Sequence, residues 1–305
     1  MHAIALPELS SAPTLIEIPK PVPKSDQVLV HVQASSLNGF DIAVASGYLL
    51  AMMEHRYPVV LGKDFAGVVE SLGEGSNKFA IGDRVFGVVM TPYLAEGGFG
   101  EYVAVNDQFG IAKIPTGVEI TEAGALGLAG AAALASIDAL DIRKDQSLLI
   151  VGATGGVGAI ATQLAISAGA RVIGTAKPGP EADFVTSQGA QNLIDPTGDL
   201  VAQVRAITPG GVDAIIHLAG DPSELPALLA PAGKIASTLG FGPDQHPAAI
   251  SIMATPDEAI LNRLAAEVAA KRLIVPITLT LELAEVPAAI AAFPTGTLGK
   301  QVVII

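Results

Sequence analysis

Four glycines separate an apolar run from an amphipathic stretch, and their spacing suits phosphate binding. Residues 148–151 (LLIV) are all apolar, as in a strand buried on both faces. Glycines follow at positions 152, 155, 156 and 158, and small or apolar residues then recur at helical spacing. A strand, a glycine turn and a helix in this order present unpaired backbone N–H groups and the positive end of the helix dipole to an anion. The residues expected to contact a pyrophosphate are Ala153, Thr154, Gly155, Gly156, Val157 and Gly158.

The glycine pattern alone is also compatible with an ordinary tight turn between a strand and a helix. Its G-x-x-G-x-x-G spacing, with Gly156 added, differs from the common G-x-G-x-x-G. The strand and helix patterns on either side favour a dinucleotide-binding turn over that alternative. No Walker lysine follows the glycines, which argues against an NTPase.

The composition limits the partners that the chain can have. Its 305 residues suggest about two domains, and its core must be aliphatic because 50% of residues are hydrophobic but only 4% aromatic. The formal net charge of −13 repels nucleic acid and anionic membranes, so we expect neither as a partner. The absence of cysteine excludes disulfides, a thiolate zinc site and a thiol nucleophile.

No targeting or membrane-spanning segment is evident. The N-terminus, MHAIALPELSS, lacks the basic region and apolar core of a signal peptide. The longest uncharged apolar stretch, residues 123–137, is shorter than a bilayer span and rich in glycine and alanine. We therefore expect a cytoplasmic protein.

The first third of the chain is typical of an all-β unit. Short strands are predicted between glycine- and proline-rich turns, which favours a partly open barrel. The predicted strands cover residues 27–33, 64–72, 83–89 and 99–105.

The pattern changes at Thr121, which is expected to cap a helix whose glycines at 124, 127 and 130 leave one side nearly bare. Strands and helices then alternate, which indicates a parallel sheet covered on both faces. Strands are predicted at 148–151, 171–175, 191–194, 212–218, 234–239 and 249–253, and helices at 181–188, 199–206, 222–229 and 257–270.

The end of the chain resumes the first pattern, with strands at 275–283 and 301–305 around a short helix near 286–293. We therefore expect a dinucleotide-binding domain, residues 122–272, inserted in a β-rich domain made of residues 1–121 and 273–305.

Several stretches resemble the medium-chain dehydrogenase/reductase superfamily in its zinc-free quinone oxidoreductase branch. They are Asn38-x-x-Asp41, the run LGKDFAGVVESLGEGSNKFAIGDRVFG from Leu61, GFGEYVAV from Gly98, the strand–glycine–helix motif and the closing LGKQVVI. The resemblance covers nearly the whole chain in order. It implies an α/β protein with a GroES-like β-rich catalytic domain and a Rossmann domain with a doubly wound parallel sheet, and it favours a homodimer.

The end of the strand at residues 171–175 bears on the choice of cofactor. An acid there would bond the ribose 2′-OH of NAD, whereas this strand ends in Thr175-Ala176-Lys177. A hydroxyl and a cation suit a 2′-phosphate, so NADP(H) is the expected cofactor, with Lys177 as its leading contact. The alternative is that Lys177 is a solvated turn lysine.

The resemblance also implies further cofactor contacts and no metal. Asn38 would lie beside the nicotinamide ribose. In zinc-dependent members, Cys and His ligands occupy the positions of Asn38 and Lys63 here, so no catalytic zinc is expected. The other implied contacts are Leu218, Ala219, Gly220, Leu239, Gly240, Phe241 and Lys300.

Hydride transfer to an electron-poor acceptor needs little beyond positioning and an oxyanion donor or proton source. A quinone or an α,β-unsaturated carbonyl is such an acceptor. Tyr48 is the candidate donor because it resembles the tyrosine of related enoyl thioester reductases; the alternative is a packing tyrosine. Asp41 is expected to fix its loop through backbone hydrogen bonds. His217 is expected to be a satisfied, partly buried histidine, and His55 an exposed one.

Three functions are therefore compatible with the sequence. The first is an NADPH-dependent quinone or enone reductase. An enoyl thioester reductase would need a basic patch for the carrier phosphate, which the charge of −13 disfavours. An NADPH-binding sensor without catalysis stays open because no acid–base pair is evident.

Overall fold

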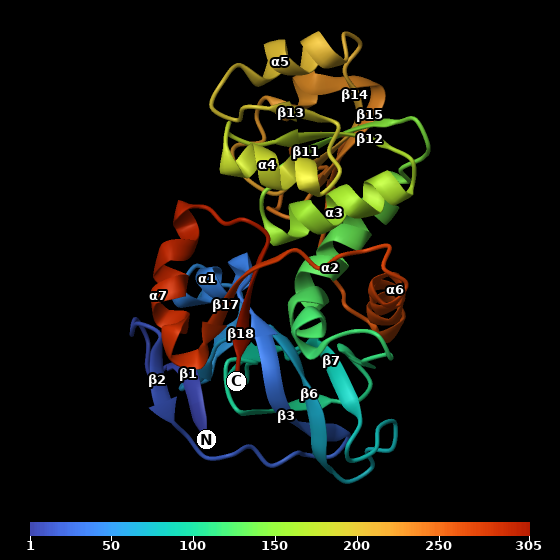
Figure 1. The fold of residues 1–305 in the computed structure, drawn as a ribbon. Coiled ribbons are helices and arrows are strands. Elements are labelled where there is room, and N and C mark those ends of the chain that lie inside the picture. The colour runs from blue at the N-terminus through green and yellow to red at the C-terminus, as the bar shows by residue number, and fades with distance from the viewer.

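The computed structural model describes residues 1–305 as two layered units joined by one long helix. Figure 1 shows a β-rich unit, which carries both termini, and a parallel-sheet unit beyond helix α2 (Ile120–Leu140). The fold is α/β, with a β-rich unit and a unit built on a parallel sheet, as the sequence predicted.

The β-rich unit is built from both ends of the chain. Its main sheet has seven strands in the order β10-β7-β6-β3-β18-β17, with β9 also paired to β3. The C-terminal strand β18 (Lys300–Ile304) lies antiparallel to β3, with Val302 opposite Ser36. The remaining elements are β1 (His2–Leu6), β2 (Thr14–Glu17), β3 (Gln27–Ser36), α1 (Gly39–Ala45), β4 (Glu54–His55), β5 (Val59–Val60), β6 (Asp64–Leu72), β7 (Arg84–Val88), β8 (Tyr93–Leu94), β9 (Tyr102–Asn106), β10 (Ile111–Lys113), β17 (Ile277–Glu282) and α7 (Val286–Ala292).

The second unit is a six-stranded, wholly parallel sheet in the order β13-β12-β11-β14-β15-β16. The chain order along the sheet reverses between β11 and β14, and ligands of such sheets bind at the carboxyl ends of the strands at this point. The elements are β11 (Ser147–Val151), α3 (Gly156–Ser167), β12 (Arg171–Thr175), α4 (Pro180–Ser187), β13 (Asn192–Ile194), α5 (Leu200–Ile207), β14 (Val212–His217), β15 (Leu229–Ser237) and β16 (Ala249–Ser251). The helix that follows, α6 (Glu258–Ala269), packs instead against α2 and β10 of the β-rich unit (Figure 1).

Helix α2 packs against both sheets, and its glycines explain how. A Cβ on Gly124 would lie 2.9 Å from the side chain of Ala34 in β3, and one on Gly127 would lie 2.8 Å from Oδ1 of Asp64 in β6. The nearly bare side that the sequence predicted therefore lets the helix approach the β-rich sheet closely. By length and composition alone α2 could cross a membrane, but 78% of its most apolar window is buried inside the protein.

Several boundaries differ from the sequence prediction. Thr121 does not cap α2, because the helix begins at Ile120 and Glu119 takes the cap position. Helix α2 has 21 residues and extends beyond residues 123–137, the apolar stretch that the sequence showed as shorter than a bilayer span. The helix expected at residues 222–229 is only a 3₁₀ turn over Leu225–Leu228, and strand β15 starts directly after it.

Candidate active site

The glycine turn leaves open space at the start of α3. Gly152 has a φ of +93°, which favours glycine, and a Cβ on Gly158 would lie 2.2 Å from the Gly152 carbonyl oxygen. A Cβ on Gly155 would instead meet nothing nearer than that same oxygen at 3.8 Å. The N–H of Ala159 is bonded to the Gly155 carbonyl, so the N–H groups before it have no partner within the helix. This open cradle of N–H groups fits the pyrophosphate of a dinucleotide.

The Thr175 hydroxyl is used to hold this turn. It accepts a hydrogen bond from the Gly152 N–H at 2.9 Å and donates to the Ile150 carbonyl at 3.4 Å. Thr175 is buried, so its hydroxyl fixes the shape of the cradle from behind.

Lys177 lies in the loop after β12 and is exposed. Glu181, in the first turn of α4, reaches back to this loop: it accepts a hydrogen bond from the Lys177 N–H at 2.9 Å, and its other oxygen lies 3.9 Å from Lys177 Nζ. The strand end expected to recognise a 2′-phosphate therefore also carries a carboxylate. The sequence placed this acid on the helix, four residues from Lys177, and its side chain reaches back from the first turn of α4 to the strand end.

The loops that follow β14 and β15 meet at the same edge of the sheet. A Cβ on Gly152 would lie 3.1 Å from the Cβ atoms of both Leu218 and Ala219, so the first loop packs on the glycine turn. In the second loop, Leu239 is exposed and Phe241 lies edge-on to His217 at a ring distance of 6.5 Å. Gly220 and Gly240, with φ values of +79° and +80°, turn the two loops.

His217 joins these two loops from the inside. Its ring is buried, with Nδ1 2.9 Å from the Ser237 hydroxyl and Nε2 3.1 Å from the Gly220 carbonyl. A carbonyl only accepts, so Nε2 carries the proton, and Ser237 then donates to Nδ1 while accepting from the Leu239 N–H. The expected satisfied histidine is confirmed, and Ser237 is the partner that the sequence did not reveal.

The C-terminal strand connects the cradle to the β-rich domain. The Gly299 N–H donates to the Thr154 carbonyl at 2.7 Å. The stem of the next residue, Lys300, lies against the helix start, because a Cβ on Gly156 would be 2.4 Å from Lys300 Cδ. The last strand of one domain thereby forms a wall of the nucleotide cradle in the other.

Lys300 ends in a buried polar network. Its ammonium faces Asn38 Oδ1 at 2.7 Å, the Leu37 carbonyl at 3.0 Å and Asp64 Oδ2 at 3.6 Å. Burial lowers the pKa of Lys300, and the carboxylates of Asp64 and Asp41 oppose that shift. Two hydrogen bonds and one ion pair thus hold the ammonium inside the protein.

Asp64 accepts hydrogen bonds on both oxygens. Oδ2 receives bonds from the Ser36 hydroxyl at 2.6 Å and from Asn38 Nδ2 at 2.8 Å, and Oδ1 receives the Leu128 N–H of α2 at 2.7 Å. The Asn38 amide is therefore bonded to Asp64 and Lys300, and Asn38 is a buried member of the network. The sequence analysis did not single out Asp64, although an acid beside the apolar residues of β6 is the signal that could have indicated this network.

Asp41 fixes its loop, as predicted. One carboxylate oxygen accepts from the Asn38 N–H at 2.9 Å, and the other accepts from the N–H groups of Gly62 at 3.2 Å and Lys63 at 3.1 Å. Burial raises the pKa of Asp41 to about 7 against the lowering effect of these bonds. The two segments that would carry metal ligands in zinc-dependent relatives are thereby joined through one carboxylate.

These two segments do not fit a zinc ion. The Asn38 side chain is occupied by Asp64 and Lys300, and the Lys63 ammonium is a hydrogen-bond donor bound to the Val89 carbonyl. Neither group offers the thiolate or imidazole lone pair that zinc prefers. The chain contains no group of three or more clustered His, Asp or Glu side chains that could replace them.

Tyr48 and His55 lie on the segment after α1. Tyr48 is 76% exposed, so it is no packing residue, and its hydroxyl makes no hydrogen bond within the protein. His55 is half-buried rather than exposed, since its Nδ1 bonds the Met53 carbonyl at 2.8 Å and its ring stacks on Tyr57.

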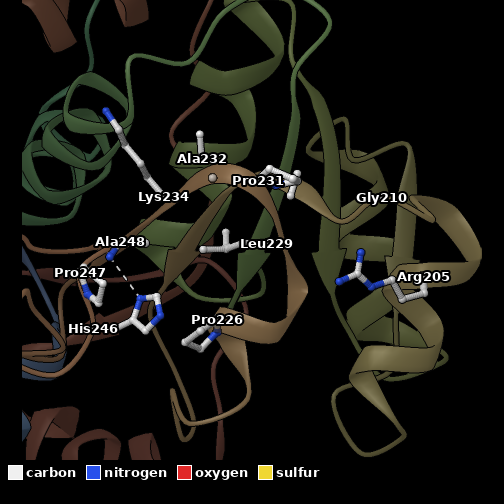
Figure 2. Close-up of a pocket in the computed structure, with 12 residues that line it drawn as sticks. Arg205, Gly210, Pro226, Leu229, Pro231, Ala232, Lys234, His246, Pro247 and Ala248 are labelled. Atoms are coloured by element: carbon white, nitrogen blue, oxygen red, sulfur yellow. Dashed lines mark hydrogen bonds between the residues drawn. The ribbon is translucent and has the colours of Figure 1, made fainter.

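One cavity lies away from these groups. It measures about 730 Å³ and runs along the amino-terminal part of β15, beside Lys234 and His246. Figure 2 shows Arg205 on its far side, where the guanidinium is bound to the carbonyls of Pro209 and Ala227. The lining side chains do not converge on one point, and the cavity is remote from the carboxyl ends of the strands, so it is not the nucleotide site.

Known proteins are similar to this chain in sequence and in fold. Residues 24–116 match the family described as "Alcohol dehydrogenase GroES-like domain", and residues 156–264 match "Zinc-binding dehydrogenase". A chloroplastic quinone-oxidoreductase homolog of Spinacia oleracea is 31% identical over 72% of this chain and 68% of its own length. A chloroplast envelope quinone oxidoreductase homolog of Arabidopsis thaliana is 32% identical over 67% of this chain and 63% of its own length. The match to the quinone oxidoreductase of Sus scrofa, at 31% identity, covers 65% of this chain and 59% of that protein.

Among solved structures, the quinone oxidoreductase from Coxiella burnetii superposes with a TM-score of 0.89 at 26% identity, over 100% of this chain and 99% of that one. A mycobacterial protein complexed with NADPH shares the fold, with a TM-score of 0.86 at 24% identity and full coverage of both chains. The chain belongs to the medium-chain dehydrogenase/reductase superfamily, a class of pyridine-nucleotide-binding oxidoreductases. Within it, the chain falls in the quinone oxidoreductase branch.

Replacing glycines of the turn should separate cofactor binding from folding. Gly155→Ala places a methyl group in the open cradle at a φ of −76°, which alanine adopts freely, so folding should be unchanged while nicotinamide dinucleotide binding weakens about tenfold or more. Gly158→Ala forces a clash with the Gly152 carbonyl and should destabilise the protein by about 1–3 kcal/mol as well. Fluorescence titration and thermal unfolding measure both effects. Equal loss of stability in the two variants would contradict the assignment of the open space beside Gly155 as the pyrophosphate site.

Breaking the buried network should be costly. Asp64→Ala leaves the Lys300 ammonium unpaired and should destabilise the protein by about 3–5 kcal/mol. Adding Lys300→Met to that variant should recover part of the loss, which denaturant unfolding and a double-mutant cycle would detect. The exposed pair of Arg263 and Asp138, 2.7 Å apart, is the control, and Asp138→Asn should change stability by less than about 1 kcal/mol. Additive effects of the buried substitutions would show that the network is not a unit.

Proposed function

We propose that the protein is an NADPH-dependent, metal-independent reductase of quinones or α,β-unsaturated carbonyl compounds. The observation that carries this proposal is the contact between the open glycine cradle and the network of Lys300, Asn38 and Asp64. A nicotinamide cofactor bound in the cradle supplies a hydride. The chain has no site that fits zinc, so an alcohol substrate would lack the Lewis acid that its oxidation by zinc-dependent relatives uses.

The protein's own part is positioning and charge. The Lys300 stem and the Gly299 backbone shape the cradle, and Asn38 and Asp41 hold the loop that leads into α1. The small-molecule acceptor would bind over the segment that carries Tyr48, whose hydroxyl is exposed. The names of several relatives specify quinone oxidoreductases, which supports an acceptor of this class.

The location and assembly are part of the same proposal. We infer a cytoplasmic homodimer that acts on a small-molecule acceptor without nucleic-acid or membrane partners. Strand β16 supports the dimer because it is an edge of the six-stranded sheet and is free to pair with a second copy.

Turnover is the direct test. NADPH should be oxidised in the presence of 1,2- or 1,4-quinones or small enones, and treatment with a metal chelator should leave the rate unchanged. The absorbance of the reduced nicotinamide measures the reaction. Tight NADPH binding without turnover of any acceptor would favour a nucleotide sensor, and a preference for enoyl thioesters would favour an enoyl thioester reductase.

The loop after β12 should decide between the two nucleotides. Lys177→Ala should weaken NADPH binding about tenfold through loss of one charge-assisted hydrogen bond, and leave NADH binding nearly unchanged. Glu181→Gln removes the nearby carboxylate and should favour NADPH further, because a 2′-phosphate is no longer repelled. Calorimetric titration with both nucleotides measures the ratio. An equal loss for both nucleotides in Lys177→Ala would contradict the phosphate contact.

A further inference from the structure

Lys63 is a half-buried cation whose hydrogen bonding is incomplete. Its ammonium donates to the Val89 carbonyl at 2.7 Å and lies 4.8 Å from the centre of the Phe40 ring. No other acceptor in the chain lies within hydrogen-bonding distance, so two N–H donors are left. Lys300, by contrast, makes two hydrogen bonds and forms an ion pair with Asp64.

Stability does not account for such a group. A partly desolvated ammonium costs free energy unless it is paired, and Lys63 forms no ion pair. The carboxylates of Asp41 and Asp64 attract it from nearby but are bonded to other groups. The two remaining donors are therefore available to something that the protein does not itself contain.

A chain of direct contacts places Lys63 beside the nucleotide cradle. Gly156 at the start of α3 touches the Lys300 stem, and Lys300 bonds Asn38. Asn38 and Lys63 both donate their backbone N–H to the same carboxylate, that of Asp41. The Lys63 backbone is thus linked to Lys300, which shapes the cradle, through Asp41 and Asn38.

The surroundings of Lys63 suit a flat conjugated molecule. The Phe40 ring lies next to the ammonium. The residue that follows its acceptor Val89 is Met90, which is 43% exposed. Phe40 belongs to α1, and the segment that follows this helix exposes the side chains of Tyr48 and Met52. A positive charge with apolar and aromatic neighbours matches an acceptor that has a polar carbonyl oxygen and an apolar ring or chain.

We propose that Lys63 is the catalytic residue that binds the carbonyl oxygen of the acceptor and protonates it. The proposal rests on the function proposed above. As the acceptor receives a hydride, which brings two electrons and one hydrogen, its oxygen gains the negative charge. A new O–H bond then forms as one Nζ–H bond of Lys63 breaks, and the neutral amine regains a proton from water. One proton is consumed for each acceptor reduced.

The environment of Lys63 favours this role. Burial lowers its pKa, and the nearby carboxylates of Asp41 and Asp64 limit the shift. A lowered pKa makes the ammonium a better proton donor near neutral pH than a solvated lysine. Tyr48 is the competing donor, so the two must be tested together.

The oxyanion site can be tested without cofactor by using 4-nitrophenol as the probe. Its coloured phenolate resembles the charged oxygen of a reduced acceptor. In the wild-type protein the apparent pKa of the bound probe should fall by about one unit or more, because a cation within hydrogen-bond reach stabilises the anion. Lys63→Met should abolish this shift. Lys24→Met, at an exposed lysine, is the matched control and should keep the shift.

The absence of cysteine allows a chemical rescue. Lys63→Cys should behave like Lys63→Met, and alkylation with 2-bromoethylamine should restore an ammonium at nearly the original position. Alkylation with iodoacetamide adds a neutral group and should restore nothing. Intact mass confirms each modification, and circular dichroism confirms that the variants are folded.

Turnover supplies the second readout. Lys63→Met should lower kcat about 100-fold with little change in KM, as expected for loss of an oxyanion donor, and aminoethylation of Lys63→Cys should recover most of it. Tyr48→Phe tests the competing donor and should lower kcat less than Lys63→Met does, and Lys24→Met, at an exposed lysine, should keep the wild-type kcat. An unchanged kcat in Lys63→Met, or a loss confined to Tyr48→Phe, would overturn the role of Lys63 and leave the proposed function standing. No turnover by the wild-type protein would overturn the proposed function, whereas no shift of the nitrophenol pKa in the wild type would overturn the Lys63 site alone.

Discussion

The pairing of Asp64 with Lys300 is the interaction on which the arrangement of the site depends. Asp64 begins a strand of the β-rich domain and also accepts the Leu128 N–H of α2, the helix that packs on both sheets. Lys300 begins the last strand, and its stem lies against the start of α3. A buried ammonium and a buried carboxylate each need the other, so the two ends of the chain and the Rossmann helix are held in one geometry. The nucleotide cradle is complete only when that geometry is reached.

The glycines of α2 and α3 matter for this arrangement as much as the buried charges do, because they leave room for neighbouring groups. Gly127 makes room for the Asp64 carboxylate against α2, and Gly156 makes room for the Lys300 stem against α3. Gly158 allows α3 to begin directly behind the Gly152 carbonyl. Gly155, at the start of α3, faces open space, and that space is where a pyrophosphate fits. Most glycines of the two helices thus serve close packing between elements, and one serves the ligand.

The same network explains why the chemistry proposed here does not use a metal. The positions that supply metal ligands in zinc-dependent relatives are Asn38 and Lys63, and both are drawn to Asp41 through their backbone. The Asn38 side chain is hydrogen-bonded within the network, whereas the Lys63 ammonium has two N–H donors without a partner in the protein. A cation fixed at this place can stabilise negative charge on an oxygen atom, which is what a Lewis acid would otherwise do.

The sequence by itself determined the fold class and the glycine cradle, because periodicity and glycine spacing are local properties of strands, turns and helices. It also determined that no thiolate site exists and that Asp41 holds its own loop, three residues from the Asn38 backbone that it binds. Only the tertiary structure decided which polar groups meet. Lys300 lies 262 residues from Asn38, His217 lies 20 residues from Ser237, and the Glu181 side chain folds back onto the Lys177 N–H. No spacing rule relates such partners, since strand order and close packing set their distances. The free donors of Lys63 likewise depend on which acceptors the fold brings near its ammonium.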